Sequence, residues 1–342
     1  MIYKSVVVTR RGGPEVMQIV ENELRAPAPG EARIKVLATS VGRTDVSYRY
    51  GRSPFSPRTP FVPGYEIVGR IEALGEPRPG AGAGGLDLNV GDQVAALTGQ
   101  GGYAEVIYLG QEHLVRLPDS LAPEEVALVV LNYVTAYQML HRVARVKAGG
   151  RALVIGASGG VGTALLQLGR LAGLKLYGTA SAGKHALLAG YGAVPIDYHT
   201  QDFVAALRQA EPAGLDYVFD GMGGDYGERG LAVLRRGGKL VGYAPPSGVA
   251  ALLLQLARLA WTNLLPNGKS AAFYGISALY MCDREPFMQD LPVLLRLLQA
   301  GQIKPVVGAR YPLLEAARAN ALLESGQVAG NIALLAPELL PA

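Results

Sequence analysis

The sequence predicts an α/β protein of two domains, one rich in β-strands and one built as a doubly wound parallel sheet. Three observations support this prediction. Residues 151–162 read as a buried strand that passes directly into a glycine turn and a helix. Strand and helix candidates then alternate, whereas the preceding third reads mainly as short strands between Gly and Pro turns. The length of 342 residues also exceeds what one ordinary core accommodates.

The N-terminal third, roughly residues 1–123, is predicted to be β-rich. Its β-branched or alternating runs indicate strands at Tyr3–Thr9, Arg33–Ser40, Ile67–Leu74, Gln93–Ala96 and Tyr103–Leu109. Residues 76–85 form a long Gly/Pro stretch, which we expect to be a mobile loop. The pattern then changes, and helices are expected over Pro123–Leu131 and Val134–Val146.

The glycine turn at residues 156–162 is the strongest functional signal. It joins the apolar run Ala152–Ile155 to Thr163–Ala172, which has helical spacing and ends before a glycine. Glycines let backbone N–H groups approach a pyrophosphate, which then lies at the positive end of the helix. The spacing departs from G-x-G-x-x-G, because Ser158 replaces the middle glycine and Gly160 is additional. A tight turn without a ligand is the alternative, but a following strand completes a βαβ unit and favours nucleotide binding.

Six strands are expected in the doubly wound sheet, as a dinucleotide-binding sheet of this type requires. They are Ala152–Ile155, Leu174–Thr179, Val194–Asp197, Leu215–Asp220, Lys239–Tyr243 and Ala271–Ile276. From residue 283 the chain reads as helix, strand (Lys304–Arg310), helix (Leu313–Ser325) and strand (Asn331–Leu335). We expect this C-terminal segment to fold back onto the N-terminal domain.

Composition limits the classes of partner. The formal net charge is +4, and Lys and Arg are scattered, so neither nucleic acid nor an anionic membrane is expected as a partner. Cys282 is the single cysteine, which leaves no disulfide framework. Residues 1–9 lack the apolar core of a signal peptide, and polar residues interrupt the apolar stretch Val249–Leu265. We therefore expect a cytoplasmic protein.

A series of short motifs along the chain resembles a known family. They are Val62–Gly69, Gly91–Val94, Gly101–Glu105, Tyr133–Tyr137, Val146–Gly150, Gly156–Gly162 and Gly330–Ala333. In this order, and over nearly the whole length, they resemble the zinc-free medium-chain dehydrogenases/reductases, in particular the NADPH:quinone oxidoreductase (zeta-crystallin-like) group. The resemblance implies a GroES-like catalytic domain over 1–124, completed by 281–342, a Rossmann NADP-binding domain over 125–280, and an active-site cleft between them. We expect a homodimer or tetramer.

No metal is expected. The zinc-dependent relatives have a cysteine and a histidine ligand where this chain has Gly42 and Tyr65, and neither residue suits Zn²⁺. Glu66 remains, but one carboxylate is not a site, and a structural role is the preferred interpretation. The four histidines are dispersed along the chain.

The expected cofactor is NADPH. A reader of the ribose 2′-OH would be an Asp or Glu about 20 residues after the glycines, but no carboxylate follows the second strand. Instead Ser181 offers a hydroxyl, and Lys184 can neutralise a 2′-phosphate. The alternative for Lys184 is a solvated lysine, although the first turn of a helix is unfavourable for a cation. The family uses a matching serine and lysine in this way, with a tyrosine that corresponds to Tyr198.

The resemblance implies further cofactor contacts, each of which could equally be a packing residue. They are Asn132, Thr135, Ala157, Ser158, Gly159, Gly160, Val161, Gly162, Gly242, Tyr243, Phe273, Tyr274, Gly275 and Asn331.

The substrate side is less defined. Relatives that reduce quinones often carry an asparagine at the position of Gly42. Tyr48, Tyr50 and Tyr65 lie near the expected cleft and are candidates to donate a proton or a hydrogen bond to a reduced oxygen. An aromatic wall of the pocket is the equally supported alternative. Asp45 is expected to organise its loop.

Residues 252–265 are too apolar to be solvated on all sides. We expect a lid over a hydrophobic substrate or, as a close alternative, a subunit contact. Two function classes follow. The first is an NADPH-dependent reductase that acts on a small apolar carbonyl or quinone substrate. It would transfer hydride to a quinone or to the C=C bond of an activated enone or enoyl substrate. The second is a non-enzymatic NADPH-binding structural or regulatory protein of the same fold.

Overall fold

The computed structural model describes residues 1–77 and 88–340. These residues form two compact units. The first unit contains residues 1–51, 55–131 and 291–342, and the second contains residues 52–54 and 132–290. The domain boundaries expected from the sequence stay a prediction. Most of the expected Gly/Pro loop at 76–85 lies outside the described residues.

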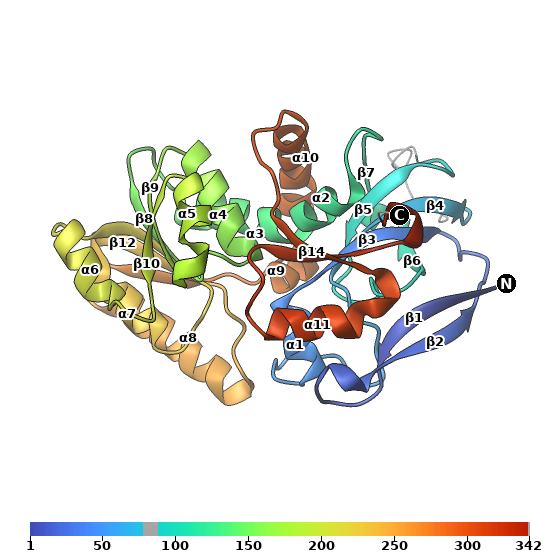
Figure 1. The fold of residues 1–342 in the computed structure, drawn as a ribbon, viewed down its shortest axis with the longest axis horizontal. Helices are drawn as coiled ribbons and strands as arrows, with labels where there is room; N and C mark the ends of the chain where they lie inside the picture. The colour runs from blue at the N-terminus through green and yellow to red at the C-terminus, as the bar shows by residue number, and fades with distance from the viewer. Residues whose placement is uncertain (78–87, 341–342) are drawn as a thin grey trace. The chain divides into compact units, whose positions relative to one another are not determined.

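The first unit is built mainly from antiparallel strands (Figure 1). Its strands are β1 (Ile2–Val8), β2 (Met17–Glu23), β3 (Glu31–Val41), β4 (Glu66–Leu74), β5 (Gln93–Leu97), β6 (Val106–Gly110), β7 (Val115–Arg116), β14 (Val307–Pro312) and β15 (Asn331–Leu335). Its helices are α1 (Arg43–Arg49), α2 (Pro123–Leu128) and α11 (Ala316–Glu324), and α10 (Glu285–Gln299) crosses the boundary between the units. One sheet has the order β14-β15-β3-β4-β5-β7, with β6 also paired to β3.

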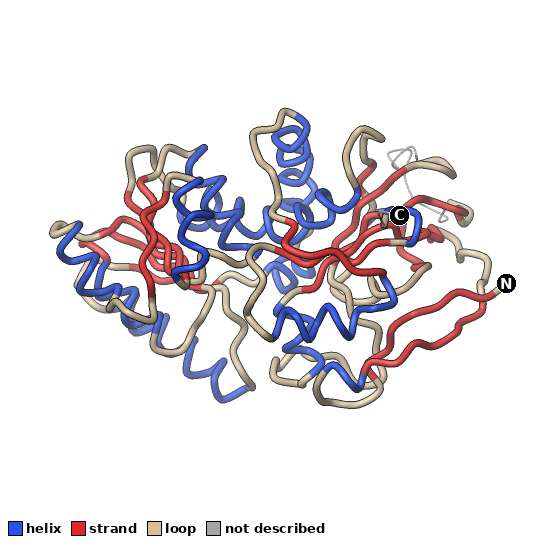
Figure 2. The backbone as a smooth tube through the Cα atoms, in the orientation of Figure 1, coloured by secondary structure: helices blue, strands red, loops and turns tan. Residues whose placement is uncertain are grey.

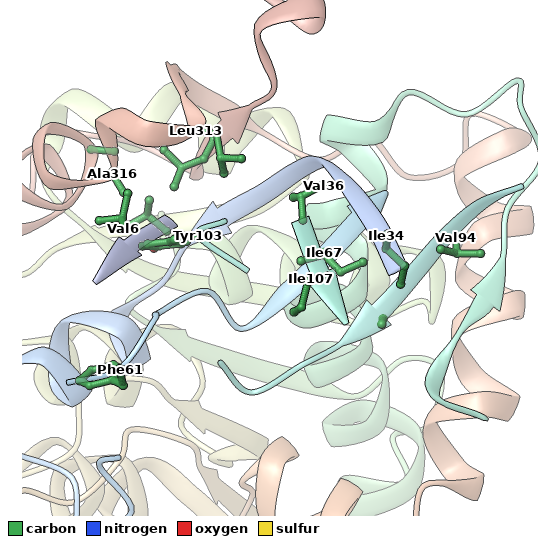
Figure 3. Close-up of a cluster of buried hydrophobic side chains, with 14 of the residues drawn as sticks. Val6, Ile34, Val36, Phe61, Ile67, Val94, Tyr103, Ile107, Leu313 and Ala316 are labelled. Atoms are coloured by element: carbon green, nitrogen blue, oxygen red, sulfur yellow. The ribbon is translucent and has the colours of Figure 1, made fainter. Parts of the chain in front are cut away.

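The C-terminal segment belongs to this sheet. β15 pairs antiparallel with β3, which brings Ile332 opposite Val41, and β14 runs parallel to β15. Leu313 and Ala316 from the same segment join the buried cluster that also holds Val6 and Ile34 (Figure 3). A large apolar side chain such as Leu313 contributes roughly 1.5–3 kcal/mol by leaving water, so the last part of the chain helps to hold the first part together.

The second unit is a six-stranded parallel sheet with helices on both faces (Figure 2). Its strands are β8 (Arg151–Ile155), β9 (Lys175–Ala180), β10 (Ala193–Asp197), β11 (Leu215–Asp220), β12 (Leu234–Gly242) and β13 (Ser270–Phe273). Its helices are α3 (Val134–Gln138), α4 (Gly160–Leu171), α5 (His185–Gly190), α6 (Phe203–Ala210), α7 (Tyr226–Val233), α8 (Val249–Leu264) and α9 (Ile276–Cys282). The order β10-β9-β8-β11-β12-β13 reverses between β8 and β11, as in the predicted doubly wound fold.

Several local predictions were incomplete. The sequence pattern did not indicate β2, which is largely exposed and pairs with β1. It also missed α1, a seven-residue helix preceded by Gly42. The two helices expected over residues 123–146 form a helical run in which α2 and α3 alternate with π-helical segments. The last strand of the second unit ends at Phe273, and Ile276 begins α9.

Residues 252–265 lie mostly within one helix, α8. Its apolar side chains are unusually exposed, with Trp261 at 65% and Leu264 at 79%. Its role as a lid or a subunit contact stays a prediction. Among the described residues, no helix is long and apolar enough to cross a membrane.

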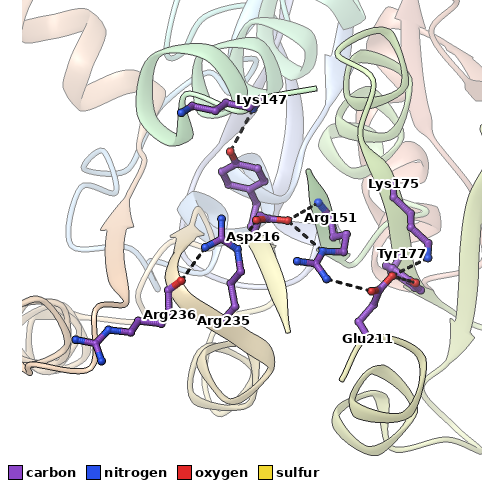
Figure 4. Close-up of polar contacts among 9 residues, drawn as sticks. Lys147, Arg151, Lys175, Tyr177, Glu211, Asp216, Arg235 and Arg236 are labelled. Carbon is purple, nitrogen blue, oxygen red and sulfur yellow. Dashed lines mark hydrogen bonds and ion pairs between the residues drawn. The ribbon is translucent and has the colours of Figure 1, made fainter. Parts of the chain in front are cut away.

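Ion pairs connect the strand starts of the second unit, which we call the amino edge (Figure 4). The Asp216 carboxylate accepts hydrogen bonds from Arg151 Nε at 3.3 Å and Arg235 Nε at 2.5 Å. The Glu211 carboxylate lies 2.7 Å from Lys175 Nζ and accepts a hydrogen bond from the Tyr177 hydroxyl at 2.6 Å. Lys175, the largest cause, and Tyr177 lower the pKa of Glu211.

Candidate functional site

The opposite edge of the sheet, where the strands end, collects most of the residues predicted to bind a cofactor. We call it the carboxyl edge. Because all six strands are parallel, the segments after Ile155, Ala180, Asp197 and Gly242 emerge at this same edge. Ligands of open α/β sheets bind there, at the point where the strand order reverses.

The glycine turn between β8 and α4 has the geometry that a close backbone approach requires. Gly156 has a φ of +80°, which glycine adopts without strain. A Cβ on Gly162 would lie 2.4 Å from the Gly156 carbonyl oxygen, so only glycine fits there. Gly159, by contrast, is exposed and would place a Cβ no closer than 3.6 Å to its neighbours. Its backbone therefore lies open to solvent.

Backbone donors are available at this turn. The turn is anchored to β9, since Gly156 N donates to Thr179 Oγ1 at 3.0 Å and Ala157 N donates to the Thr179 carbonyl at 3.1 Å. The first N–H groups of α4, from Gly160 to Gly162, have no acceptor within the helix. Ser158 and Val161 are only partly buried beside them. This 12-residue helix thus directs donors and its positive end at the solvent, where a pyrophosphate fits.

Ser181 and Lys184 lie directly after β9, next to the glycine turn along the sheet. Both are partly buried, and the Lys184 N–H donates to the Ser181 carbonyl at 2.9 Å, which closes a short helical turn. Tyr198 follows β10, is 46% exposed, and has its ring centre 4.2 Å from that of His199. The structure brings these three residues to one edge, as the proposed 2′-phosphate contacts require. Their role stays a prediction.

A second glycine turn at this edge was missed. Asp220 ends β11, and its Oδ1 accepts the N–H groups of Met222 at 2.9 Å and Gly223 at 3.0 Å. Burial raises the pKa of Asp220. Tyr243 covers this turn, because a Cβ on Gly221 would lie 2.4 Å from its hydroxyl oxygen. The run Gly221–Gly224 directly after a strand is the sequence signal that could have indicated it.

The other predicted cofactor contacts lie in the helical run, at the ends of the last two strands of the second unit, or in the first unit. Asn132 and Thr135 are buried in the helical run that contains α3. The buried Tyr274 hydroxyl donates to Gln138 Oε1 at 2.7 Å, while Phe273, Gly275 and Gly242 are half-buried at the strand ends. Asn331 belongs to the first unit, where its Nδ2 donates to the Val306 carbonyl at 3.2 Å. Its role as a cofactor contact stays a prediction.

In the first unit, two of the three predicted catalytic tyrosines lie together. The hydroxyl of Tyr48, on α1, is 3.3 Å from that of Tyr65, directly before β4. Tyr50 lies elsewhere, because its hydroxyl donates to Glu324 Oε2 at 2.9 Å. Arg49, fully buried next to Tyr50, also pairs with Glu324. We call Tyr48 and Tyr65 the tyrosine pair.

Two buried carboxyls lie near the tyrosine pair. Asp45 accepts the N–H groups of Gly42 at 2.9 Å and Gly64 at 3.0 Å, and burial raises its pKa to about 6. Asp45 therefore organises the loop, as the sequence predicted. Glu66 Oε1 accepts Ser40 N at 2.8 Å and Ser40 Oγ at 2.5 Å, whereas its buried Oε2 has no partner. Burial raises the pKa of Glu66 to about 8.

These surroundings keep Tyr65 neutral. Burial is the main cause that raises the pKa of Tyr65, and the neighbouring Tyr48, Asp45 and Glu66 add to it. A neutral phenol keeps its proton and can donate it or a hydrogen bond.

Known proteins share both units. Residues 28–119 match the alcohol dehydrogenase GroES-like domain, and residues 191–334 match the zinc-binding dehydrogenase family. A quinone oxidoreductase of Lama guanicoe is 31% identical over 98% of this chain and 98% of its own length. The chain belongs to the quinone oxidoreductase group of the medium-chain dehydrogenase/reductase family. It is accordingly an oxidoreductase.

Two further relatives widen this group. A synaptic vesicle membrane protein VAT-1 homolog of Danio rerio is 30% identical over 97% of this chain and 70% of its own length. A mycobacterial protein solved as a complex with NADPH is 30% identical, with a TM-score of 0.83 over 97% of this chain and 99% of that one.

In this chain, Gly42 and Tyr65 stand at the positions expected to ligate zinc in the zinc-dependent relatives. Gly42 has no side-chain donor, and the Tyr65 hydroxyl faces Tyr48. Glu66 Oε1 already accepts two hydrogen bonds from Ser40. Over residues 1–77 and 88–340, no group of three His, Cys, Asp or Glu side chains could hold a metal ion. These residues do not provide the ligands that a zinc site needs.

Proposed function

We propose that this chain is an NADPH-dependent reductase that transfers hydride to a quinone or to the activated C=C bond of an enone or enoyl substrate, without a metal. The observation that carries the proposal is the carboxyl edge of the second unit. There the open glycine turn and the start of α4 lie beside Ser181 and Lys184, with no carboxylate among residues 181–185 to repel a 2′-phosphate. The relative solved with NADPH supports the choice of cofactor.

The residues have separate tasks in this proposal. NADPH supplies the hydride when it is bound. The N–H groups at the start of α4 hold the pyrophosphate, and Ser181 and Lys184 select the 2′-phosphate. The tyrosine pair keeps a phenolic proton at Oη that can pass to, or hydrogen-bond, the oxygen of a reduced substrate. Burial, with a smaller contribution from the neighbouring Tyr48 hydroxyl, maintains the neutral state of Tyr65.

Steady-state oxidation of NADPH across quinones, enones, aldehydes and enoyl thioesters tests the proposal. We expect turnover with quinones or enones that have apolar tails, slower turnover with NADH, and unchanged rates after dialysis against a strong chelator. Tyr65→Phe should lower kcat, and Tyr50→Phe is the matched control, because its hydroxyl is bound to Glu324. Zinc lost together with activity would contradict the metal-free mechanism.

A non-enzymatic NADPH-binding role is the second candidate. The absence of a polar side chain at Gly42 favours it, since no side chain there can orient a substrate. If no compound of the panel accelerates NADPH oxidation while NADPH still binds tightly, the non-enzymatic role is supported and the reductase is refuted. A cytoplasmic location and a homodimer or tetramer remain part of the proposal, and they rest on composition and on the resemblance.

A further inference from the structure

The first unit has an open surface pocket of about 540 Å³, which we call the cavity, and none of the predicted site residues lines it. Its lining residues are Pro57, Arg58, Pro60, Phe61, Val62, Gln100 and Gly101. The volume lies within the range of small-molecule sites. Prolines, a phenylalanine and a valine make most of the wall apolar, whereas the Arg58 guanidinium and the Gln100 amide provide the polar side-chain groups.

The charge at this cavity is positive and uncompensated. None of the lining residues is acidic. Arg58 is exposed and forms no ion pair or hydrogen bond with another described residue. A second guanidinium, that of Arg11, lies 5.7 Å from the centre of the Phe61 ring, and it donates only to backbone carbonyls of Tyr48 and Pro57. Among the lining residues, an anion would therefore meet the Arg58 cation and no carboxylate.

The wall is held in place by backbone contacts. Phe61 N donates to the Val8 carbonyl at 3.2 Å, and Val8 N donates to the Phe61 carbonyl at 2.8 Å. Gly101 N donates to the Val62 carbonyl at 2.8 Å, which joins the two lining segments. Arg11 connects Pro57 to the carbonyl of Tyr48. The cavity thus shares one support with the tyrosine pair, and its lining segment 60–62 continues along the chain into Tyr65.

We propose that this cavity is a subsite for the anionic group of an apolar substrate, a carboxylate or a phosphate, and that Arg58 is its cation. A guanidinium binds either group through two parallel N–H donors. The apolar wall fits the body of the same molecule. The identity of the ligand as a substrate rests on the proposed function, but the binding itself does not.

Calorimetry with three naphthalene probes tests the binding. The probes are 2-naphthoate, 2-naphthyl phosphate and the neutral 2-naphthamide. Arg58→Gln should weaken the anionic probes about tenfold or more, the loss expected for a hydrogen bond to a charged group, and should weaken the amide much less. Arg58→Lys keeps the charge but loses the pair of parallel N–H donors. Its affinity for the anionic probes should lie between those of the unmodified protein and Arg58→Gln. The preferred anion in the unmodified protein distinguishes carboxylate from phosphate.

Arg170→Gln is the matched control, because Arg170 is an exposed arginine in the second unit. It should bind all three probes as the unmodified protein does. Equal losses for the anionic and neutral probes in Arg58→Gln, or no binding of either anion, would overturn the subsite. Thermal unfolding of each variant confirms that the comparison is made between folded proteins.

A kinetic arm separates this inference from the proposed function. A naphthoquinone that carries a carboxylate is compared with its methyl ester, and Arg58→Gln should lower the ratio of their kcat/KM values about tenfold. If Arg58→Gln reduces quinones with an unchanged ratio of the two kcat/KM values, the proposed reductase stands and the subsite is refuted. Loss of anion binding in Arg58→Gln without any reductase activity would keep the subsite and refute the reductase.

Discussion

The two edges of the six-stranded sheet differ in whether their polar groups are paired within the fold. At the amino edge, Asp216 and Glu211 are surrounded by arginine and lysine side chains (Figure 4). At the carboxyl edge, the strands run into glycine turns and exposed backbone at the start of α4. The difference teaches that charges compensated within the fold stabilise it, whereas donors left open at the carboxyl edge are available to a ligand.

The pH dependence of stability at Glu66 should be the largest effect. Glu66 is a buried carboxyl, and only one of its two oxygens has hydrogen-bond partners. The unfolded chain releases this proton near pH 4.3, whereas burial raises the pKa of folded Glu66 to about 8. Between these values the unfolded state binds fewer protons, so stability falls as the pH rises, by up to about 1.4 kcal/mol per pH unit. Glu66→Gln should remove this fall, as measured by denaturant unfolding from pH 5 to pH 8.

Glu23→Gln is the control for Glu66, since Glu23 is exposed. Its stability should follow the unmodified protein at every pH. Parallel profiles for Glu66→Gln and the unmodified protein would show that Glu66 is ionised in the folded state.

Asp216→Ala tests the amino edge. The substitution leaves Arg151 and Arg235 without their shared carboxylate, and we expect the free energy of unfolding to fall by about 3 kcal/mol. The affinity for NADPH should not change, because Asp216 lies at the opposite edge. Chemical denaturation and NADPH titration measure the two quantities. Asp119→Ala, at an exposed position of the first unit, should alter neither. A large loss of NADPH affinity would contradict the separation of the edges.

Asp216 should also respond to pH in the opposite sense to Glu66. Burial alone would raise the pKa of Asp216, but the Arg151 N–H and the Arg235 side chain outweigh it and lower the value. The stability that Asp216 contributes is therefore present above the unfolded pKa, near 3.9, and is lost as the pH falls through the folded value.

Lys184→Ala tests the carboxyl edge. NADPH binding should weaken by ~1.5–3 kcal/mol, the range for a hydrogen bond to a charged group, while NADH binding and stability stay nearly unchanged. Fluorescence titration with both cofactors provides the measurement. Lys147→Ala removes an exposed lysine from the amino side of the sheet and should leave both affinities intact. Equal losses for NADPH and NADH in Lys184→Ala would refute the 2′-phosphate assignment.

Trp261→Ala should have the smallest effect on stability, within about 0.5 kcal/mol, because the side chain is 65% exposed. If α8 is a subunit contact, the oligomer should dissociate more readily in sedimentation experiments. If α8 is a lid, KM for bulky substrates should rise instead. An unchanged oligomer and an unchanged KM would show that the exposed face of α8 has neither role.

The carboxyl edge was largely predictable because its signal is local. Strand, glycine turn and helix follow one another within residues 151–171, and parallel strands then bring Ser181 and Tyr198 to the same edge. The second turn at Gly221 was overlooked although its glycines were visible. What the sequence cannot show is that Tyr243 covers this turn, since that contact depends on the pairing of β11 with β12.

The surroundings of the tyrosine pair could not be predicted in the same way. The pairing of β3 with β4 brings Ser40 to Glu66, which is distant in sequence. Tyr103 comes from a third segment, held by backbone hydrogen bonds to Val6 and Pro63. The sequence suggested three tyrosines as equals, but the bond from Tyr50 to Glu324 depends on the position of α11. Burial, which raises the pKa of Glu66, is likewise a property of the assembled sheet.

The position of β15 in the sheet of the first unit has a consequence for synthesis. β3 emerges from the ribosome early, yet one of its partners, β15, is made only after the whole second unit. The second unit, nearly continuous in sequence, is complete before the last strand exists. Until then the free edge of β3 can pair with other chains. Nascent chains stalled before residue 331 should accordingly bind chaperones. Release of the completed chain from the ribosome should let β15 pair with β3 and end this binding.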